Sequence, residues 1–188
     1  MDIEISKIAK LPTKFGIFQI QSFKEGEKEH LCIFKGDLKG DVNIRIHSEC
    51  ITGDTLSSLK CDCGEQLDFA LRYIQENGGL IIYLRQEGRG IGLLNKINAY
   101  SLQDEGLDTV EANLKLGFKE DERRYDVVNF ILKHYKISSV NLMTNNPLKI
   151  KSLGLEVELK QRIPIKIQSN DFNKEYLRIK EEKMGHLT

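Results

Sequence analysis

The sequence predicts a single compact α+β domain, a mixed α/β fold in which a β-rich N-terminal third precedes alternating helices and strands. Its 188 residues suit one domain with a substantial core. The first fifty residues contain short alternating or β-branched runs, and from residue 64 the apolar spacing follows the helical period. No repeat, low-complexity segment or linker interrupts the chain. We therefore expect residues 1–188 to form one unit.

Strands are predicted where apolar or β-branched residues alternate or cluster between turn residues. In the first third they are expected at residues 16–21, 31–34 and 42–46. The apolar runs 80–84 and 140–143 predict two short buried strands. The run 163–167 contains Pro164, which favours an edge strand.

Helices are predicted from apolar residues three and four positions apart. They are expected at about residues 67–77, 93–105, 127–132 and 172–184, the last as a charged surface helix. Gly78 and Gly106 indicate where the first two helices end. On its own spacing, Tyr100 belongs to the apolar face of the second helix and packs in the core.

Charge and hydropathy exclude two classes of partner. The 28 basic side chains equal the 28 acidic ones, so no overall basic field indicates nucleic-acid binding. No apolar run approaches the length of a membrane span, and the N-terminus lacks the apolar stretch of an export signal. Together with free cysteines, this indicates a cytoplasmic protein that binds no membrane.

Three of the four cysteines, Cys50, Cys61 and Cys63, lie close together in the sequence. In an extended segment, Cys61 and Cys63 would point to one face and could chelate one ion. Three thiolates leave one zinc position open for water, which is typical of a catalytic site. The alternatives are a strained redox pair, three inert buried thiols, or a closed non-catalytic zinc module with His47 as fourth ligand. Cys32, in an apolar run, is expected in the core.

Three other segments each allow two interpretations. The glycine-rich run 85–92 follows a predicted strand and precedes a helix, so it is either an anion-binding loop or an ordinary turn. The charged run 120–125 is either a solvated helix start or part of a site. Residues 144–147 end a buried strand, where ligand loops collect in α/β sheets, but they also form a plausible turn.

Taken together, these segments resemble GTP cyclohydrolase II in its stand-alone form, without an added synthase domain. The similarity covers nearly the whole chain and keeps its order. The matching segments are residues 45–54, 61–64, 85–97, 108–113, 116–118, 121–123, 142–147 and 183–186.

The resemblance implies a zinc-dependent hydrolase that opens the imidazole ring of GTP, the first step of riboflavin biosynthesis. The products would be formate, pyrophosphate and 2,5-diamino-6-ribosylamino-4(3H)-pyrimidinone 5′-phosphate. It further implies Mg²⁺ on the triphosphate and a homodimer. A family variant that stops at a formamide intermediate is an alternative. A zinc nucleobase deaminase is disfavoured because its His-x-Glu and Pro-Cys-x-x-Cys motifs are missing.

The resemblance also implies residue roles. Cys50, Cys61 and Cys63 would bind zinc, and water on the metal would attack C8 of GTP. Arg123 would be a nucleophile on the α-phosphate or a charge clamp, and Asp121 its proton acceptor. Tyr100 would take part in ring opening. The implied GTP contacts are Arg45, Ile46, His47, Ser48, Glu49, Gln66, Glu87, Gly88, Arg89, Thr109, Thr144 and Lys149.

Overall fold

A mixed sheet of eight strands runs through the part of the chain that the computed structural model describes, residues 2–119, 121–182 and 184–187. The strand order is β1-β3-β4-β6-β5-β7-β8, and β2 pairs with β3 outside that path. The strands are β1 (Glu4–Ile5), β2 (Ala9–Thr13), β3 (Gly16–Glu25), β4 (Lys28–Lys35), β5 (Asp41–Ser48), β6 (Gly79–Leu84), β7 (Ser139–Met143) and β8 (Glu158–Ile163).

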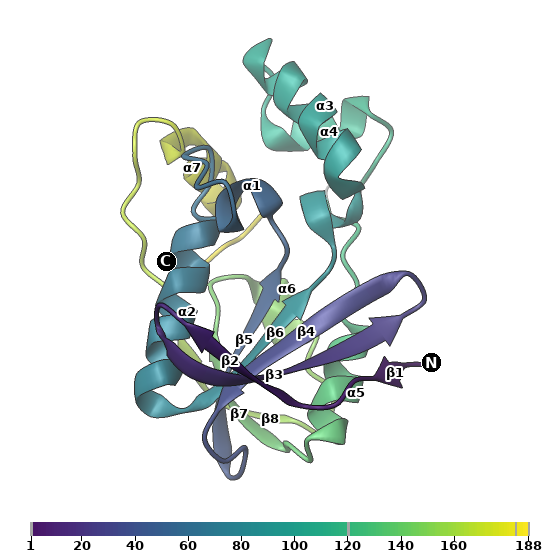
Figure 1. The fold of residues 1–188 in the computed structure, drawn as a ribbon. Helices are drawn as coiled ribbons and strands as arrows, with labels where there is room; N and C mark the ends of the chain where they lie inside the picture. The colour runs from purple at the N-terminus through teal and green to yellow at the C-terminus, as the bar shows by residue number, and fades with distance from the viewer. Residues whose placement is uncertain (1, 120, 183, 188) are drawn as a thin grey trace.

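Helices occupy both faces of the sheet and one of its edges (Figure 1). Those described are α1 (Ile51–Asp54), α2 (Cys63–Asn77), the 3-10 turn η1 (Glu87–Gly90), α3 (Gly92–Asp104), α4 (Thr109–Lys115), α5 (Asp126–His134), α6 (Pro147–Lys151) and α7 (Lys174–Glu182). The predicted α+β class is therefore confirmed. Within the described ranges, no helix is both long enough and apolar enough to cross a membrane.

The core consists of two clusters, one on each face of the sheet. Ile82 of β6 packs in the cluster that contains Ile131 of α5, whereas its neighbour Ile81 packs in the cluster that contains Ile74 of α2. Successive residues of a strand point to opposite faces, so the continuous apolar run of β6 serves both clusters. All four side chains are fully buried.

The parallel strands at the centre of the sheet determine where the site forms. β5 pairs in parallel with β6 and with β7, so the carboxyl ends of these three strands meet at one edge. Ser48 of β5 lies opposite Leu84 of β6 in the register. The segments that follow the three strands contain Cys50, Arg89 and Thr144, all of which line the same pocket.

The strand predicted at residues 163–167 is displaced in the structure. β8 ends at Ile163 and pairs only with β7, so it is an edge strand that precedes Pro164 instead of containing it. Proline has no N–H to donate and ends the ladder there. Most residues of β8 are charged or polar, so a search for apolar runs did not identify this strand.

The apolar face predicted for the second helix is not in the core. In Figure 1, α3 and α4 form an arm that extends away from the sheet. Leu93, Leu94 and Ile97 of α3 are 43%, 76% and 47% exposed. Helical spacing identified the helix, but not the surface that it covers. Helix α4 was not predicted, although its capping box between Asp108 and Glu111 is a helix-start motif.

The terminal helix predicted at about residues 172–184 is present as α7. Its inner side is buried at Ile179 and Lys180, so it is not simply a surface helix. Two residues of predicted motifs, Glu120 and Lys183, lie outside the described residues.

Candidate active site

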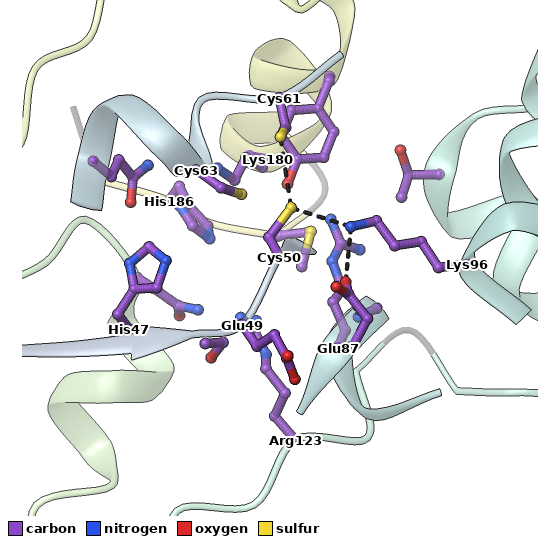
Figure 2. A pocket seen from close by; sticks show the side chains of 18 of the residues that line it. His47, Glu49, Cys50, Cys61, Cys63, Glu87, Lys96, Arg123, Lys180 and His186 are labelled. Atoms are coloured by element: carbon purple, nitrogen blue, oxygen red, sulfur yellow. Dashed lines mark hydrogen bonds and ion pairs between the residues drawn. The ribbon is translucent and has the colours of Figure 1, made fainter. Parts of the chain in front are cut away.

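The sulfur atoms of Cys50, Cys61 and Cys63 form one group. Their Sγ atoms all lie within 4.8 Å of one another, and those of Cys50 and Cys61 are 3.7 Å apart (Figure 2). Two sulfurs that each lie about 2.3 Å from a tetrahedral zinc are about 3.8 Å apart. The donor set and its spacing therefore fit a metal ion such as zinc.

Local backbone structure brings the three cysteines together in a way that differs from the expected extended segment. Cys50 precedes α1, and Cys63 is the first residue of α2. Asp62 between the two cysteines is the N-cap, with φ −104° and ψ 12°. The two side chains therefore converge through a bend that starts a helix, not through the alternation of a strand.

Gly53 allows α1 to lie against the sulfur group. A Cβ atom at this position would be 2.8 Å from Cys61 Sγ and 3.3 Å from Cys50 Sγ. Gly64 of α2 is equally crowded, because its Cβ would be 2.5 Å from the carbonyl oxygen of Gly53. Glycine at both positions permits the close contact of α1 with α2 that assembles the group.

The three thiols differ in acidity. Hydrogen bonds from Cys61 and Cys63 hold the pKa of Cys50 well below its ordinary value. The same hydrogen bonds raise the pKa of Cys61 and of Cys63, with burial adding to the effect. One thiolate centred on Cys50 is thus stabilised by two neighbouring thiols, and a thiolate is the form that binds metal.

Lys96 on α3 contacts this thiolate, and the sequence analysis missed it. Its Nζ donates to Cys50 Sγ at 3.1 Å and to Glu87 Oε1 at 2.7 Å (Figure 2). Glu87 Oε2 accepts from the backbone N–H of Ile51 at 2.6 Å. Burial lowers the pKa of Lys96, but Glu87 and Cys50 outweigh it and leave the pKa raised. A buried cation therefore balances the negative charge of the sulfur group.

Tyr100 lies on the wall of the pocket, not in the core as its spacing alone predicted. Its hydroxyl is 3.3 Å from Thr52 Oγ1, and that Oγ1 is 3.6 Å from Cys50 Sγ. Burial raises the pKa of Tyr100 to about 12, so the phenol keeps its proton at neutral pH. It can donate a hydrogen bond to a ligand beside the sulfur group.

Arg123 and Asp121 form a tight ion pair, which differs from the solvated helix start considered for this run. The Arg123 Nε donates to Asp121 Oδ1 at 2.8 Å, and its side chain is 11% exposed. Although burial opposes both changes, the pair raises the pKa of Arg123 and lowers that of Asp121. The guanidinium therefore stays charged, and Asp121 is a weak proton acceptor.

The glycine-rich loop directs Arg89 into the pocket. Arg89 has a φ of 59°, between Gly88 and Gly90, which also have positive φ values. Both terminal nitrogens of its guanidinium are buried without a hydrogen-bond partner among the described residues. Arg85, by contrast, is exposed and pairs with Glu49 at 2.9 Å. Only Arg89 of the two lines the pocket, and its free donors suit an anion.

Lys149 adds a second basic side chain, and none of the described acidic residues forms an ion pair with it. Its Nζ donates to the carbonyl oxygen of Ile46 at 2.8 Å. Burial, together with the charges of Arg45, Arg123 and Lys180, holds the pKa of Lys149 well below its ordinary value. These neighbouring positive charges favour the neutral form of Lys149. An anion bound among them would favour its charged form instead.

The structure brings most predicted site residues to this one pocket. Besides the cysteines and Tyr100, those that line it are Arg45, His47, Ser48, Glu49, Gln66, Glu87, Gly88, Arg89, Thr109, Arg123, Thr144 and Lys149. Ile46 does not line it, because its side chain is fully buried in the core. Asp121 reaches it only through Arg123. Residues that sequence analysis missed include Lys96, Asn113, Tyr176, Lys180 and His186.

His47 is not part of the metal-capable group found among the described residues. Its Nε2 lies 3.1 Å from Asp54 Oδ1, and its ring stacks on Tyr83 at 5.4 Å between centroids. Burial lowers the pKa of His47. This arrangement disfavours the closed module in which His47 would be a fourth protein ligand.

The fold and the site together define an α+β enzyme with a group of thiols that could hold a metal, next to a pocket lined by basic side chains. The model of the family GTP cyclohydrolase II matches residues 4–164, and the chain belongs to this family. It is similar to proteins named GTP cyclohydrolase-2 from three organisms. The chain is 62% identical to the protein of Campylobacter hominis over 187 residues, and the match covers 100% of this chain and 96% of the relative.

Two further relatives agree over similar lengths. The protein of Campylobacter fetus subsp. fetus is 62% identical over 190 residues, and that of Helicobacter pylori is 52% identical over 189 residues. These matches cover 100% and 98% of this chain, and 97% and 98% of the relatives. A solved two-domain 3,4-dihydroxy-2-butanone 4-phosphate synthase from A. baumannii aligns over 86% of this chain and 40% of its own, at 17% identity and a TM-score of 0.48, too low for any conclusion.

Proposed function

We propose that the protein opens the imidazole ring of GTP by zinc-dependent hydrolysis, as the first step of riboflavin biosynthesis. Formate and pyrophosphate would be released, leaving 2,5-diamino-6-ribosylamino-4(3H)-pyrimidinone 5′-phosphate. The observation that carries this proposal is the 3.7 Å spacing of thiol sulfurs beside basic side chains that form no ion pair with any described acidic residue, in a chain of this family. We further propose that residues 1–188 act as one catalytic unit in the cytoplasm.

Cys50, Cys61 and Cys63 would hold the zinc, since their spacing fits its tetrahedral geometry. When bound, zinc supplies a Lewis acid and a water that is nucleophilic near neutral pH, directed at C8. Lys96 and Glu87 would keep Cys50 in place. Tyr100 would donate its phenolic proton during ring opening, which its raised pKa supports.

The cations would bind the triphosphate together with Mg²⁺. Arg89 and Lys149 line the pocket, and no acidic residue in the described ranges pairs with either, so phosphate oxygens can accept their hydrogen bonds. Gln66 and Glu87 would recognise guanine, whose N1–H, N2–H₂ and O6 require both acceptors and donors. The remaining expected contacts that line the pocket, Arg45, His47, Ser48, Glu49, Gly88, Thr109 and Thr144, would complete the GTP site.

Arg123 would act as a charge clamp on the α-phosphate, not as a covalent nucleophile. Its ion pair with Asp121 supports this, because a nucleophilic guanidine must first lose its proton. The raised pKa of Arg123 and the lowered pKa of Asp121 both oppose that transfer. Asp121 would then orient the guanidinium and keep it charged.

We also propose that a second copy of the chain covers the exposed apolar side chains of the α3–α4 arm. Leu94 and Leu114 are 76% and 59% exposed there, and burying apolar surface of this kind stabilises dimers. Sedimentation equilibrium of the wild type and of Leu94→Glu tests the homodimer. A wild type that sediments as a monomer would contradict it.

The function is tested by incubating the protein with GTP, Zn²⁺ and Mg²⁺ and identifying the products by mass. Cys61→Ser should lose formate release, whereas Cys32→Ala, which changes a buried core cysteine away from the pocket, should retain it. A product that keeps the formyl group would indicate the formamide variant. No turnover by the zinc-loaded wild type would indicate a non-catalytic zinc module.

A further inference from the structure

The C-terminal segment, residues 173–182 and 184–187, lies beyond residue 164, where the match to the family ends. Its outer side is solvated, with Arg178 paired to Glu175 and Glu182. Its inner side is buried at Ile179 and Lys180. The side chains that it contributes to the pocket wall are Tyr176, Lys180, Met184 and His186.

Two hydrogen bonds between described residues connect this segment to the rest of the site. The backbone N–H of Leu187 donates to the carbonyl oxygen of Asn145 at 2.8 Å. Lys180 Nζ donates to Asp62 Oδ1 at 2.8 Å, and the two side chains are only 11% and 5% exposed. Breaking such a buried pair leaves a charge without compensation, unlike breaking an ion pair at the surface.

Asp62 connects Lys180 to the substrate side of the pocket. Its Oδ2 accepts from Gln66 Nε2 at 2.5 Å, and Gln66 Oε1 accepts from an Arg45 terminal nitrogen at 2.5 Å. Arg45 also donates to the carbonyl oxygen of Met143 at 3.0 Å. These bonds determine which way the Gln66 amide faces, since its NH₂ points to Asp62 and its oxygen to Arg45.

Asp62 also lies between two of the three cysteines, at the bend from Cys61 into α2. The position of its carboxylate therefore affects the metal-capable turn and the Gln66–Arg45 pair at the same time. Without Lys180, the buried carboxylate between Cys61 and Cys63 would lose its cation, and the bend would relax toward water.

We propose that Lys180 is a positioning residue, which through Asp62 fixes the Cys61–Cys63 turn and orients Gln66, so that the C-terminal segment is a functional wall of the site. The effect on Gln66 rests on the proposed GTP reaction, whereas the effect on the turn does not. Mutation of a residue that contacts and orients a metal ligand commonly lowers metal affinity about 10- to 100-fold.

The test compares Lys180→Met with Lys174→Met on the outer side of the same helix, whose side chain is 68% exposed. Metal affinity is measured without GTP by competition with a chromophoric chelator, and the Co²⁺-substituted protein reports ligand geometry by its visible spectrum. KM and kcat for formate release are measured separately at saturating zinc. Asp62→Asn, which is nearly isosteric, serves as a second variant that breaks the same ion pair from its acidic side.

Lys180→Met should weaken metal binding at least tenfold, change the Co²⁺ spectrum and raise KM for GTP, while Lys174→Met matches the wild type. Should Lys180→Met fail to fold, Asp62→Asn should show the same changes. The inference is overturned if either folded variant binds metal within twofold of the wild-type affinity and has the wild-type Co²⁺ spectrum. A wild type that binds metal but leaves GTP intact refutes the proposed function instead, and the metal measurements still decide the role of Lys180.

Discussion

Replacement of Lys96 by methionine is expected to destabilise the protein even before any metal or substrate is added. Lys96 and Glu87 side chains are 9% and 8% exposed, and their charged atoms are 2.7 Å apart. The substitution keeps most of the aliphatic stem but leaves the Glu87 carboxylate buried without a cation. Removing one partner of such a pair costs about 3–5 kcal/mol.

The loss of unfolding free energy is measured by urea denaturation, followed by circular dichroism with a chelator present. For an m-value of about 2 kcal/mol/M, the midpoint should fall by roughly 1.5–2.5 M. Lys24→Met is the control, because Lys24 pairs with Glu4 at 3.3 Å with both side chains exposed. That substitution should cost less than about 1 kcal/mol.

A second substitution identifies the cause of the loss. Adding Glu87→Gln to Lys96→Met removes the uncompensated charge and should recover most of the stability, because a neutral amide can still accept from Ile51 N–H. Equal midpoints for Lys96→Met and Lys24→Met would refute the argument. Failure of the double variant to recover would show that the buried charge is not the cause.

Three further outcomes are expected. Gly53→Ala should weaken zinc binding at least tenfold in a chelator competition, because the added methyl group would lie 2.8 Å from Cys61 Sγ; unchanged affinity would contradict this. Tyr100→Phe should reduce formate release more than pyrophosphate release, and an equal loss of both would exclude a specific role in ring opening. Burial lowers the pKa of His30 in the folded protein below the value near 6.5 of the unfolded chain. As the pH falls below 6.5, the unfolded chain therefore binds a proton more readily than the folded protein, and the stability that neutral His30 contributes is lost. The free energy of unfolding should therefore decrease below pH 6.5, less steeply in His30→Asn, which can still accept from Arg85 N–H; parallel curves would contradict this.

The short-range features of the fold followed from the sequence. The helix over residues 67–77 and the buried strand at 80–84 were correct because apolar periodicity and the glycines between the two elements are local signals. Helix α3 was also found, but its exposed leucines were assigned to the core. Spacing shows that one face of a helix is apolar, and does not show whether the same chain covers it.

The site was predictable where its residues are close in sequence or match the family, and not where distant helices supply counter-charges. Lys96 lies 46 positions from Cys50, and Lys180 lies 118 positions from Asp62. In the sequence, each is a lysine within a predicted helix, and such lysines usually lie on the solvated face. Burial and pairing, which only the folded chain displays, distinguish them from the many surface lysines.

The central claim, hydrolysis at C8 that depends on the three cysteines, is tested most directly with GTP labelled with carbon-13 at C8. The zinc-loaded wild type should convert the label to formate, observed by NMR, and the chelator-treated protein should not. Return of zinc to the treated protein should restore the signal. Formate from the metal-free protein, or a label that stays in the nucleotide when zinc is bound, would contradict the claim.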